Sequence, residues 1–174
     1  STTTGFGSKY SDPSTLPVST LNDVAFSPDS SAIAVVNAFS PYLSIYLWSS
    51  AGGFGTVSSP ATPPGGSATG VAFSSDGSVV AVSSGSSPYV SVYPWSAAAG
   101  FGTKYSNPGT LPPDFGRKVT FSPDNSAIAI SHSTTPFITV YPWSTAGGFG
   151  TKYSDPGTLP VHSGLGPIVR FSPN

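Results

Sequence analysis

The sequence contains no Cys, Met, Glu or Gln, and charged residues make up only 7% of it, six basic and seven acidic. Average domains carry about 25% charged residues. The absence of Cys excludes a disulfide framework. The Lys and Arg residues are scattered, so no nucleic-acid surface is predicted. No apolar run approaches the roughly 20 residues that a membrane-spanning helix requires, so no membrane insertion is predicted.

Internal repetition is the dominant feature of the chain. Three markers recur with one period: Gly-Phe-Gly, Val-x-Phe-Ser and Tyr-x-Trp-Ser. Their aromatic residues are Phe6, Phe54, Phe101 and Phe149; Phe26, Phe73, Phe121 and Phe171; and Trp48, Trp95 and Trp143. The spacings are 48, 47 and 48, then 47, 48 and 50, then 47 and 48. A shared period of this length predicts a repeat architecture.

Each repeat predicts four short strands. In the first copy these are 23–26, 32–36 and 43–48, where apolar and polar residues alternate, and a fourth strand follows Gly-Phe-Gly, as in 101–105. The turn Ser-Pro-Asp separates the first two strands, since Pro and Asp both favour tight turns. The Pro of Tyr-Pro-Trp is predicted to end the third strand, because Pro is confined to strand ends and edges. With 20 Gly and 19 Pro, long helices are not expected.

Four short strands in a unit of this size fit one blade of a β-propeller, so the predicted fold is all-β, with about three and a half four-stranded antiparallel blades. Phe-Ser-Pro-Asp, an aliphatic strand and a strand ending in Trp resemble the WD40 repeat. The Trp is followed by Ser rather than Asp, so the chain is WD40-like. The Gly-Phe-Gly-Thr-Lys-Tyr and Tyr-Pro-Trp-Ser motifs resemble bacterial and phage repeat proteins of mostly unassigned function. The resemblance implies a partial propeller or part of a larger ring.

The whole of 1–174 is predicted to form one repeat array. Its parts are a fourth strand and linking loop of a preceding blade at 1–22, blade 1 at 23–69, blade 2 at 70–117, blade 3 at 118–167, and the first strand of a further blade at 168–174. The chain lacks Met and ends in a turn, so we expect it to belong to a longer polypeptide. An uncovered blade face exposes apolar surface, so self-association, or association with other segments of the same assembly, is predicted.

No catalytic constellation is apparent, and the chain is not expected to be an enzyme. Most of the carboxylates recur at equivalent turns, which indicates turn chemistry; Asp23 and Asp114 stand alone, in what we predict to be loops before first strands. A metal site usually needs three or four ligands, and His132 and His162 are the only histidines. No metal or other cofactor is therefore predicted.

Aromatic residues in loops are the candidate binding feature. Each loop between the second and third strands carries Pro and then an aromatic residue: Tyr42, Tyr89 and Phe137. In a WD40-like blade this loop shares a face with the linkers between blades, so the candidate binding face also holds Asp23, Asp114, Arg117 and His162. Aromatic rings with a few polar neighbours bind sugars or proteins. The alternative is that these rings only fill the gaps between blades.

Two functions follow. The first is a non-enzymatic structural or assembly module of a larger extracellular, virion or surface protein, which mediates protein–protein contacts. The alternative is a lectin-like propeller that binds a carbohydrate or protein ligand through the aromatic loops. The extracellular, cell-surface or virion location is suggested by the sparse charge and the many serines.

Overall fold

The computed structural model describes residues 7–159 and 168–172, which form twelve β-strands and no helix, hence none able to cross a membrane. The strands are β1 (Leu21–Phe26), β2 (Ala32–Asn37), β3 (Leu43–Ser49), β4 (Gly53–Ser58), β5 (Ala68–Phe73), β6 (Val79–Ser84), β7 (Val90–Ser96), β8 (Gly100–Phe101), β9 (Gly116–Phe121), β10 (Ala127–His132), β11 (Ile138–Ser144) and β12 (Gly148–Phe149). They pair into three antiparallel sheets of four strands in chain order, which are blades 1, 2 and 3. The predicted all-β, four-stranded blades are confirmed.

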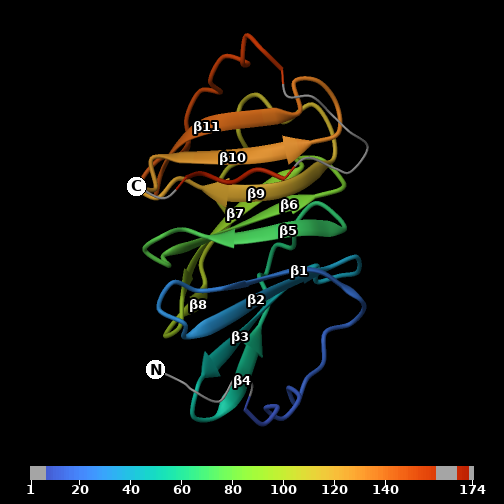
Figure 1. Ribbon diagram of the computed structural model, residues 1–174, viewed down its shortest axis with the longest axis vertical. Coiled ribbons are helices and arrows are strands. Elements are labelled where there is room, and N and C mark those ends of the chain that lie inside the picture. The colour runs from blue at the N-terminus through green and yellow to red at the C-terminus, as the bar shows by residue number, and fades with distance from the viewer. Residues whose placement is uncertain (1–6, 160–167, 173–174) are drawn as a thin grey trace.

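The three blades follow one another along the long axis of the molecule, from blade 1 at the bottom of Figure 1 to blade 3 at the top. The first strand of each blade contacts that of the next, β1 with β5 and β5 with β9. The first strands therefore form the inner edge of the array, and β4, β8 and β12 form its outer edge.

The turn between the first and second strands is built by hydrogen bonds from serine to aspartate, as the Ser-Pro-Asp motif predicts. In blade 1, Ser27 Oγ donates to Asp29 Oδ1 at 2.6 Å, and Ser31 N donates to the same oxygen at 3.0 Å. These bonds stabilise the ionised carboxylate and lower the pKa of Asp29. The equivalent bond from Ser122 lowers the pKa of Asp124 to about 2. The repeated aspartates thus act in turn formation.

The sheets begin at Leu21, Ala68 and Gly116, in each case two residues before the predicted blade boundaries at 23, 70 and 118. Strands predicted at the two ends of the chain are not seen in the described residues, since 7–20 and 168–172 contain none. A strand is defined by its backbone pairing, and these segments have no strand of their own blade beside them.

The prolines of Tyr-Pro-Trp do not end the third strands, which corrects the prediction. Pro94 lies inside β7 and pairs with Val79 of β6. Its carbonyl accepts a bond from Gly102 N on the outer side, so the missing N–H also faces outward and leaves the β6 pairing intact. The outer ladder is weakened instead: β8 and β12 have two residues each, whereas β4, beside Leu47, has six. The fourth strands therefore begin at Gly-Phe rather than after it.

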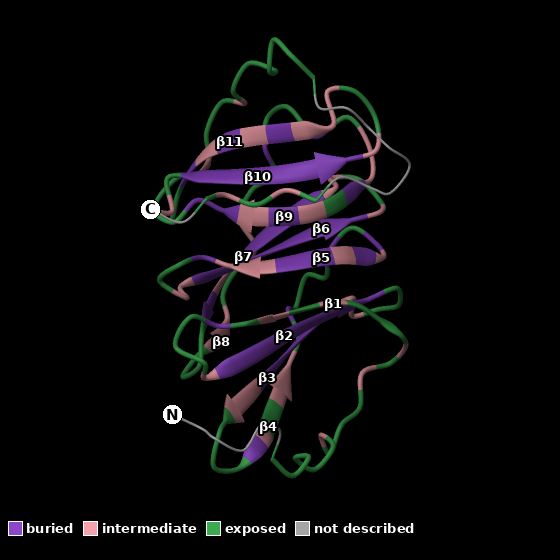
Figure 2. Cartoon of the chain, viewed as in Figure 1, coloured by how far each residue is buried: buried purple, intermediate pink, exposed green. Residues whose placement is uncertain are grey.

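The apolar cores lie between neighbouring blades. Each blade has a leading face, directed at the previous blade, and a trailing face, directed at the next one. The leading face of blade 2 comprises Val71, Val80, Val82, Tyr93 and Trp95, and the trailing face of blade 1 comprises Ala32, Ala34, Val36, Leu43 and Ile45. The corresponding faces of blades 2 and 3 form the second core. Figure 2 shows β2 and β10 buried along their whole length. Large side chains on one sheet pack against small and aliphatic ones on the next.

A tyrosine also joins blade 2 to blade 3 at the outer edge. Tyr105 packs edge-on against Trp143, with ring centroids 4.9 Å apart, and its hydroxyl donates to Thr145 O at 2.8 Å. In the opposite direction, the hydroxyl of Tyr141 donates to Thr110 O at 2.7 Å. We call this pair of reciprocal contacts the tyrosine joint. Its rings lie within the range where aromatic pairs attract.

Between blades 1 and 2 the tyrosine joint is absent. Ser58 pairs with Ile45, which is the equivalent of Val92, the partner of Tyr105. Blade 1 therefore has a serine at the position of the joint tyrosine. Tyr93 corresponds to Tyr141, but within the described residues its hydroxyl donates no equivalent hydrogen bond to a backbone carbonyl. Burial raises the pKa of Tyr93 to about 12.

The two buried tyrosines should respond differently to loss of their hydroxyl groups. Tyr141→Phe removes the bond to Thr110 O and should lower the free energy of unfolding by about 1 kcal/mol. Tyr93→Phe, the matched control, should change it little. Urea titrations followed by tryptophan fluorescence measure both values. Equal losses in the two variants would contradict the conclusion that the hydroxyl of Tyr141, but not that of Tyr93, donates a stabilising bond across the blades.

Candidate functional site

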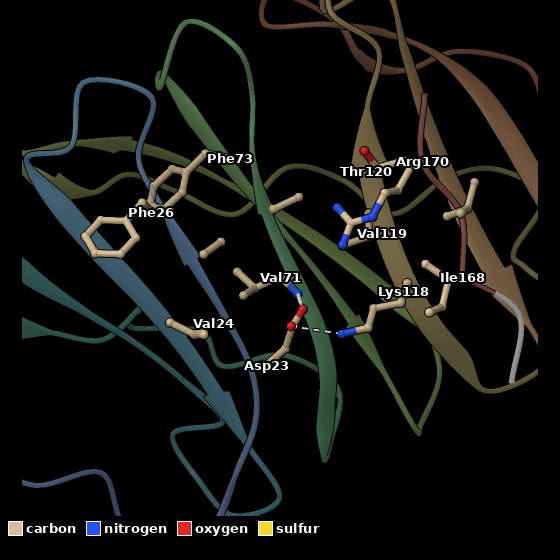
Figure 3. Close-up of a pocket in the computed structure, with 13 residues that line it drawn as sticks. Asp23, Val24, Phe26, Val71, Phe73, Lys118, Val119, Thr120, Ile168 and Arg170 are labelled. Atoms are coloured by element: carbon tan, nitrogen blue, oxygen red, sulfur yellow. Dashed lines mark hydrogen bonds and ion pairs between the residues drawn. The ribbon is translucent and has the colours of Figure 1, made fainter. Parts of the chain in front are cut away.

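A cavity of about 350 Å³ lies on the inner edge of the array and is lined by β1, β5, β9 and residues 168–170. Figure 3 shows Asp23 directed at Lys118 across this space, with Phe26 and Phe73 at one end and Arg170 at the other. The cavity therefore brings together segments from the whole length of the chain.

An ion pair connects the first and third blades at this inner edge. Asp23 of β1 lies 2.9 Å from Lys118 Nζ of β9, and its other oxygen accepts a 2.9 Å bond from Val71 N of β5. Gly70 occupies the equivalent position in blade 2, and a Cβ there would lie 3.0 Å from Lys118 Cα. Absence of a side chain at Gly70 leaves room for the first and third blades to meet.

Asp23 is therefore not in a loop of the binding face, which corrects the prediction. It lies within β1, beyond an irregularity between Leu21 and Asp23, and faces the inner edge. The charges of Asp23 and Lys118 compensate each other. Arg170 adds a further cation to a lining that is otherwise mostly aliphatic and aromatic. In 7–159 and 168–172, no three His, Cys, Asp or Glu residues come together as a metal site would require.

The aromatic loops share one unusual backbone geometry. Tyr42, Tyr89 and Phe137 each follow a cis proline and adopt positive φ angles of 64°, 68° and 69°. Such angles are uncommon for bulky residues and are imposed by surrounding structure. In each loop the aromatic N–H donates to the carbonyl three residues earlier, such as Tyr42 N to Phe39 O at 2.8 Å. The Pro-aromatic pair found in each repeat was the available signal for this turn.

All three aromatic rings are half-buried, and Tyr42 packs against the core between blades 1 and 2. Contacts with this core support the gap-filling interpretation for Tyr42. The Tyr89 loop lies between two linkers: Gly65 is next to Ser87, and Gly85 lies under the ring of Phe115. The loops and the linkers thus meet at one end of the blades.

The remaining predicted residues lie near the loop of blade 3. Arg117, in β9, is exposed; its guanidinium stacks 4.7 Å above the ring of Phe115, and Nε donates to Ser133 Oγ at 2.8 Å. Asp114 is half-buried in the preceding linker. His162 lies outside the described residues. The structure therefore separates Asp23 from the loop group and leaves Asp114 and Arg117 in it.

His132 is a fully buried residue of blade 3, at the end of β10. Thr134 O can only accept, so Nδ1 donates to it at 2.8 Å, and Nε2 accepts from the Thr139 hydroxyl at 2.9 Å. A neutral imidazole protonated at Nδ1 satisfies both bonds. Burial lowers the pKa of His132, while the Thr134 carbonyl and the charge of Asp114 act in the opposite direction.

Similarity to known proteins is limited to the fold. No family model matches the sequence, and no curated protein matches it. Among solved structures, the WD40 repeats of RRP9 are 22% identical with a TM-score of 0.52, and a Lactobacillus plantarum protein is 19% identical with a TM-score of 0.58. A Bacteroides fragilis protein described as a candidate 6-phosphogluconolactonase is 15% identical with a TM-score of 0.62.

Each of these three comparisons covers 76% of this chain but only 38%, 40% and 37% of the respective structure. At identities this low the likeness shows the fold alone. The chain is thus a part of a β-propeller, of about three blades, whose structural neighbours include WD40 repeats.

The buried histidine should make stability depend on pH. Because the pKa of His132 is lowered by folding, the unfolded chain takes up a proton near pH 6.5 and the native chain only at lower pH. The stability that it contributes is present above pH 6.5 and is lost as the pH falls from there through the native pKa. His132→Asn, which introduces the residue of the equivalent Asn37, should flatten this dependence. Urea titrations from pH 8 to pH 5 measure it, and an unchanged slope would contradict the prediction.

Two substitutions separate the roles of the Asp23 carboxylate. Asp23→Ala removes both the Val71 bond and the charge facing Lys118, and should lower the free energy of unfolding by about 2 kcal/mol. Asp23→Asn retains an oxygen for Val71 N and should cost about half as much. Denaturant titrations at low and high salt measure both. Equal losses would show that the backbone bond contributes nothing.

Proposed function

We propose that this chain is a non-enzymatic assembly module that binds protein through the leading face of blade 1. The supporting observation is the exposure of equivalent residues. Val24 and Phe26 on this face are 56% and 53% exposed, whereas Val71, Val119 and Phe121 on the other leading faces are 6%, 5% and 7% exposed. The residue types are those of a blade core, but none of the three described blades covers them.

Covering this face would be favourable. Full burial of a Val or Phe side chain contributes about 1.5–3 kcal/mol, so the half-exposed Val24 and Phe26 together could contribute about 2 kcal/mol. Leu21, in the same strand, is also exposed. Contiguous apolar surface of this kind is typical of protein-binding sites.

A non-enzymatic role is supported by the use of the carboxylates. Asp29, Asp76 and Asp124 each accept bonds from turn serines, and Asp23 is paired with Lys118. Of these four aspartates only Asp23 lines the inner cavity, and its ion pair with Lys118 leaves no unpaired carboxylate among them to act there as an acid or base. We further propose an extracellular, cell-surface or virion setting in a larger bacterial or phage protein. The 7% charge content and the repeat motifs support that setting.

The alternative is a lectin-like site on the loop face. It is favoured by one observation: Tyr89 and Phe137 remain partly accessible, and the exposed Arg117 donates to Ser133 in the loop that carries Phe137. Reproducible binding on a glycan array that is lost in Tyr89→Ala would support this alternative over the assembly module.

The assembly role predicts that the average particle mass in solution rises with protein concentration. Phe26→Ser removes apolar surface from the leading face and should shift association to higher concentration, as measured by light scattering. Phe39→Ser is the matched control, because Phe39 is 65% exposed but lies in the loop between β2 and β3. A monomeric mass at every concentration, or equal effects of the two variants, would contradict the proposal.

A further inference from the structure

One ten-residue segment occurs three times, at 7–16, 102–111 and 150–159, and we call these copies the joint segments. The first and last copies differ only at Ser8, which is Thr151, and Ser14, which is Gly157. Two nearly identical sequences therefore lie at opposite ends of the array.

The middle copy shows what a joint segment does when blades lie on both sides of it. It pairs with its own blade through Gly102 N to Pro94 O at 2.9 Å and Tyr105 N to Val92 O at 3.0 Å. On its other side, Tyr105 makes the tyrosine joint with blade 3. A complete joint thus has a backbone half, towards the preceding blade, and a side-chain half, towards the following one.

The first copy makes the side-chain half. Tyr10 packs against Trp48 at 4.8 Å and donates to Ser50 O at 2.7 Å, and the hydroxyl of Tyr46 donates to Thr15 O at 2.9 Å. These contacts reproduce those of Tyr105 with blade 3. Gly53 completes the groove, because a Cβ there would lie 3.2 Å from the Tyr10 ring.

The last copy makes the backbone half. Gly150 N donates to Pro142 O at 2.9 Å, and Tyr153 N donates to Val140 O at 2.9 Å. Tyr153 is 52% exposed, and among the described residues no tryptophan packs against its ring. The segment is therefore held in the orientation of the middle copy, with its side-chain half open.

We infer that the groove of blade 1 formed by Tyr46, Trp48, Ser50 and Gly53 is a docking site for residues 150–159 of a second copy of the chain. Residues 7–16 occupy this groove within one chain and leave it when the second copy docks. The inference rests on the proposed assembly function and adds the segments that form the contact. The occupant is specified by sequence, since the groove already binds the same side chains.

The exchange is close to balanced, which makes it sensitive to single residues. Both occupants offer the same tyrosine and the same threonine carbonyl, and residues 7–16 have the advantage of being tethered to blade 1. Docking of the second copy has a different advantage, because its blade 3 then covers Val24 and Phe26 of the first chain. Weakening the tethered occupant should therefore strengthen association between chains.

A peptide corresponding to residues 148–159 tests the groove directly. Labelled with a fluorophore and titrated with the 174-residue chain, it should bind Tyr10→Ala about tenfold more tightly than wild type, because the aromatic contact of the competing segment is lost. The same peptide with its tyrosine replaced by alanine is the control and should bind the wild-type chain and Tyr10→Ala equally. Equal binding of the peptide to both chains, or no binding to either, would overturn the inference.

Light scattering of the full chain separates this inference from the proposed function. Tyr10→Ala should associate at lower concentration than wild type and Tyr153→Ala at higher concentration. If Tyr10→Ala loses the native circular dichroism signal, Tyr10→Phe, which loses only the bond to Ser50 O, takes its place. Association that is unchanged in Tyr153→Ala would leave the assembly function in place and exclude this segment. Monomers throughout would exclude both.

Discussion

The packing of one blade against the next is the constraint on which the rest of this structure depends. A four-stranded sheet in this chain has few charges and no disulfide to hold it, and its apolar residues are buried only where another sheet covers them. The leading face, the trailing face and the tyrosine joint all serve that contact. Val24 and Phe26 of blade 1 show the consequence: they are more than half exposed, whereas Val71 of blade 2 and Val119 and Phe121 of blade 3 are buried under the preceding blade.

Individual character arises where the repeats differ. Successive first strands place Asp23, Gly70 and Lys118 at one equivalent position, and this variation creates an ion pair across the inner edge. His132 is the counterpart of Asn37, and its burial gives one blade a response to pH. Repetition thus supplies the scaffold, and substitutions at single positions supply what is specific to each blade.

Much of the fold was predictable because its causes are local. The period, the alternation in 32–36 and 43–48 and the Ser-Pro-Asp turns correspond to observed strands and hydrogen bonds. The course of the fourth strands was not, because it depends on which side of β7 the missing N–H of Pro94 faces. Contacts between Asp23 and Lys118, or Tyr10 and Trp48, depend on how successive blades are placed, which one repeat does not encode.

The central claim is that the tyrosine joint couples neighbouring blades energetically. A double-mutant cycle on Tyr105→Leu and Trp143→Leu, with unfolding free energies from urea titrations, measures that coupling within a single chain. The account predicts that the two losses are not additive and differ from their sum by about 0.5–1.5 kcal/mol. Additive losses would mean that the two rings act independently and would contradict it.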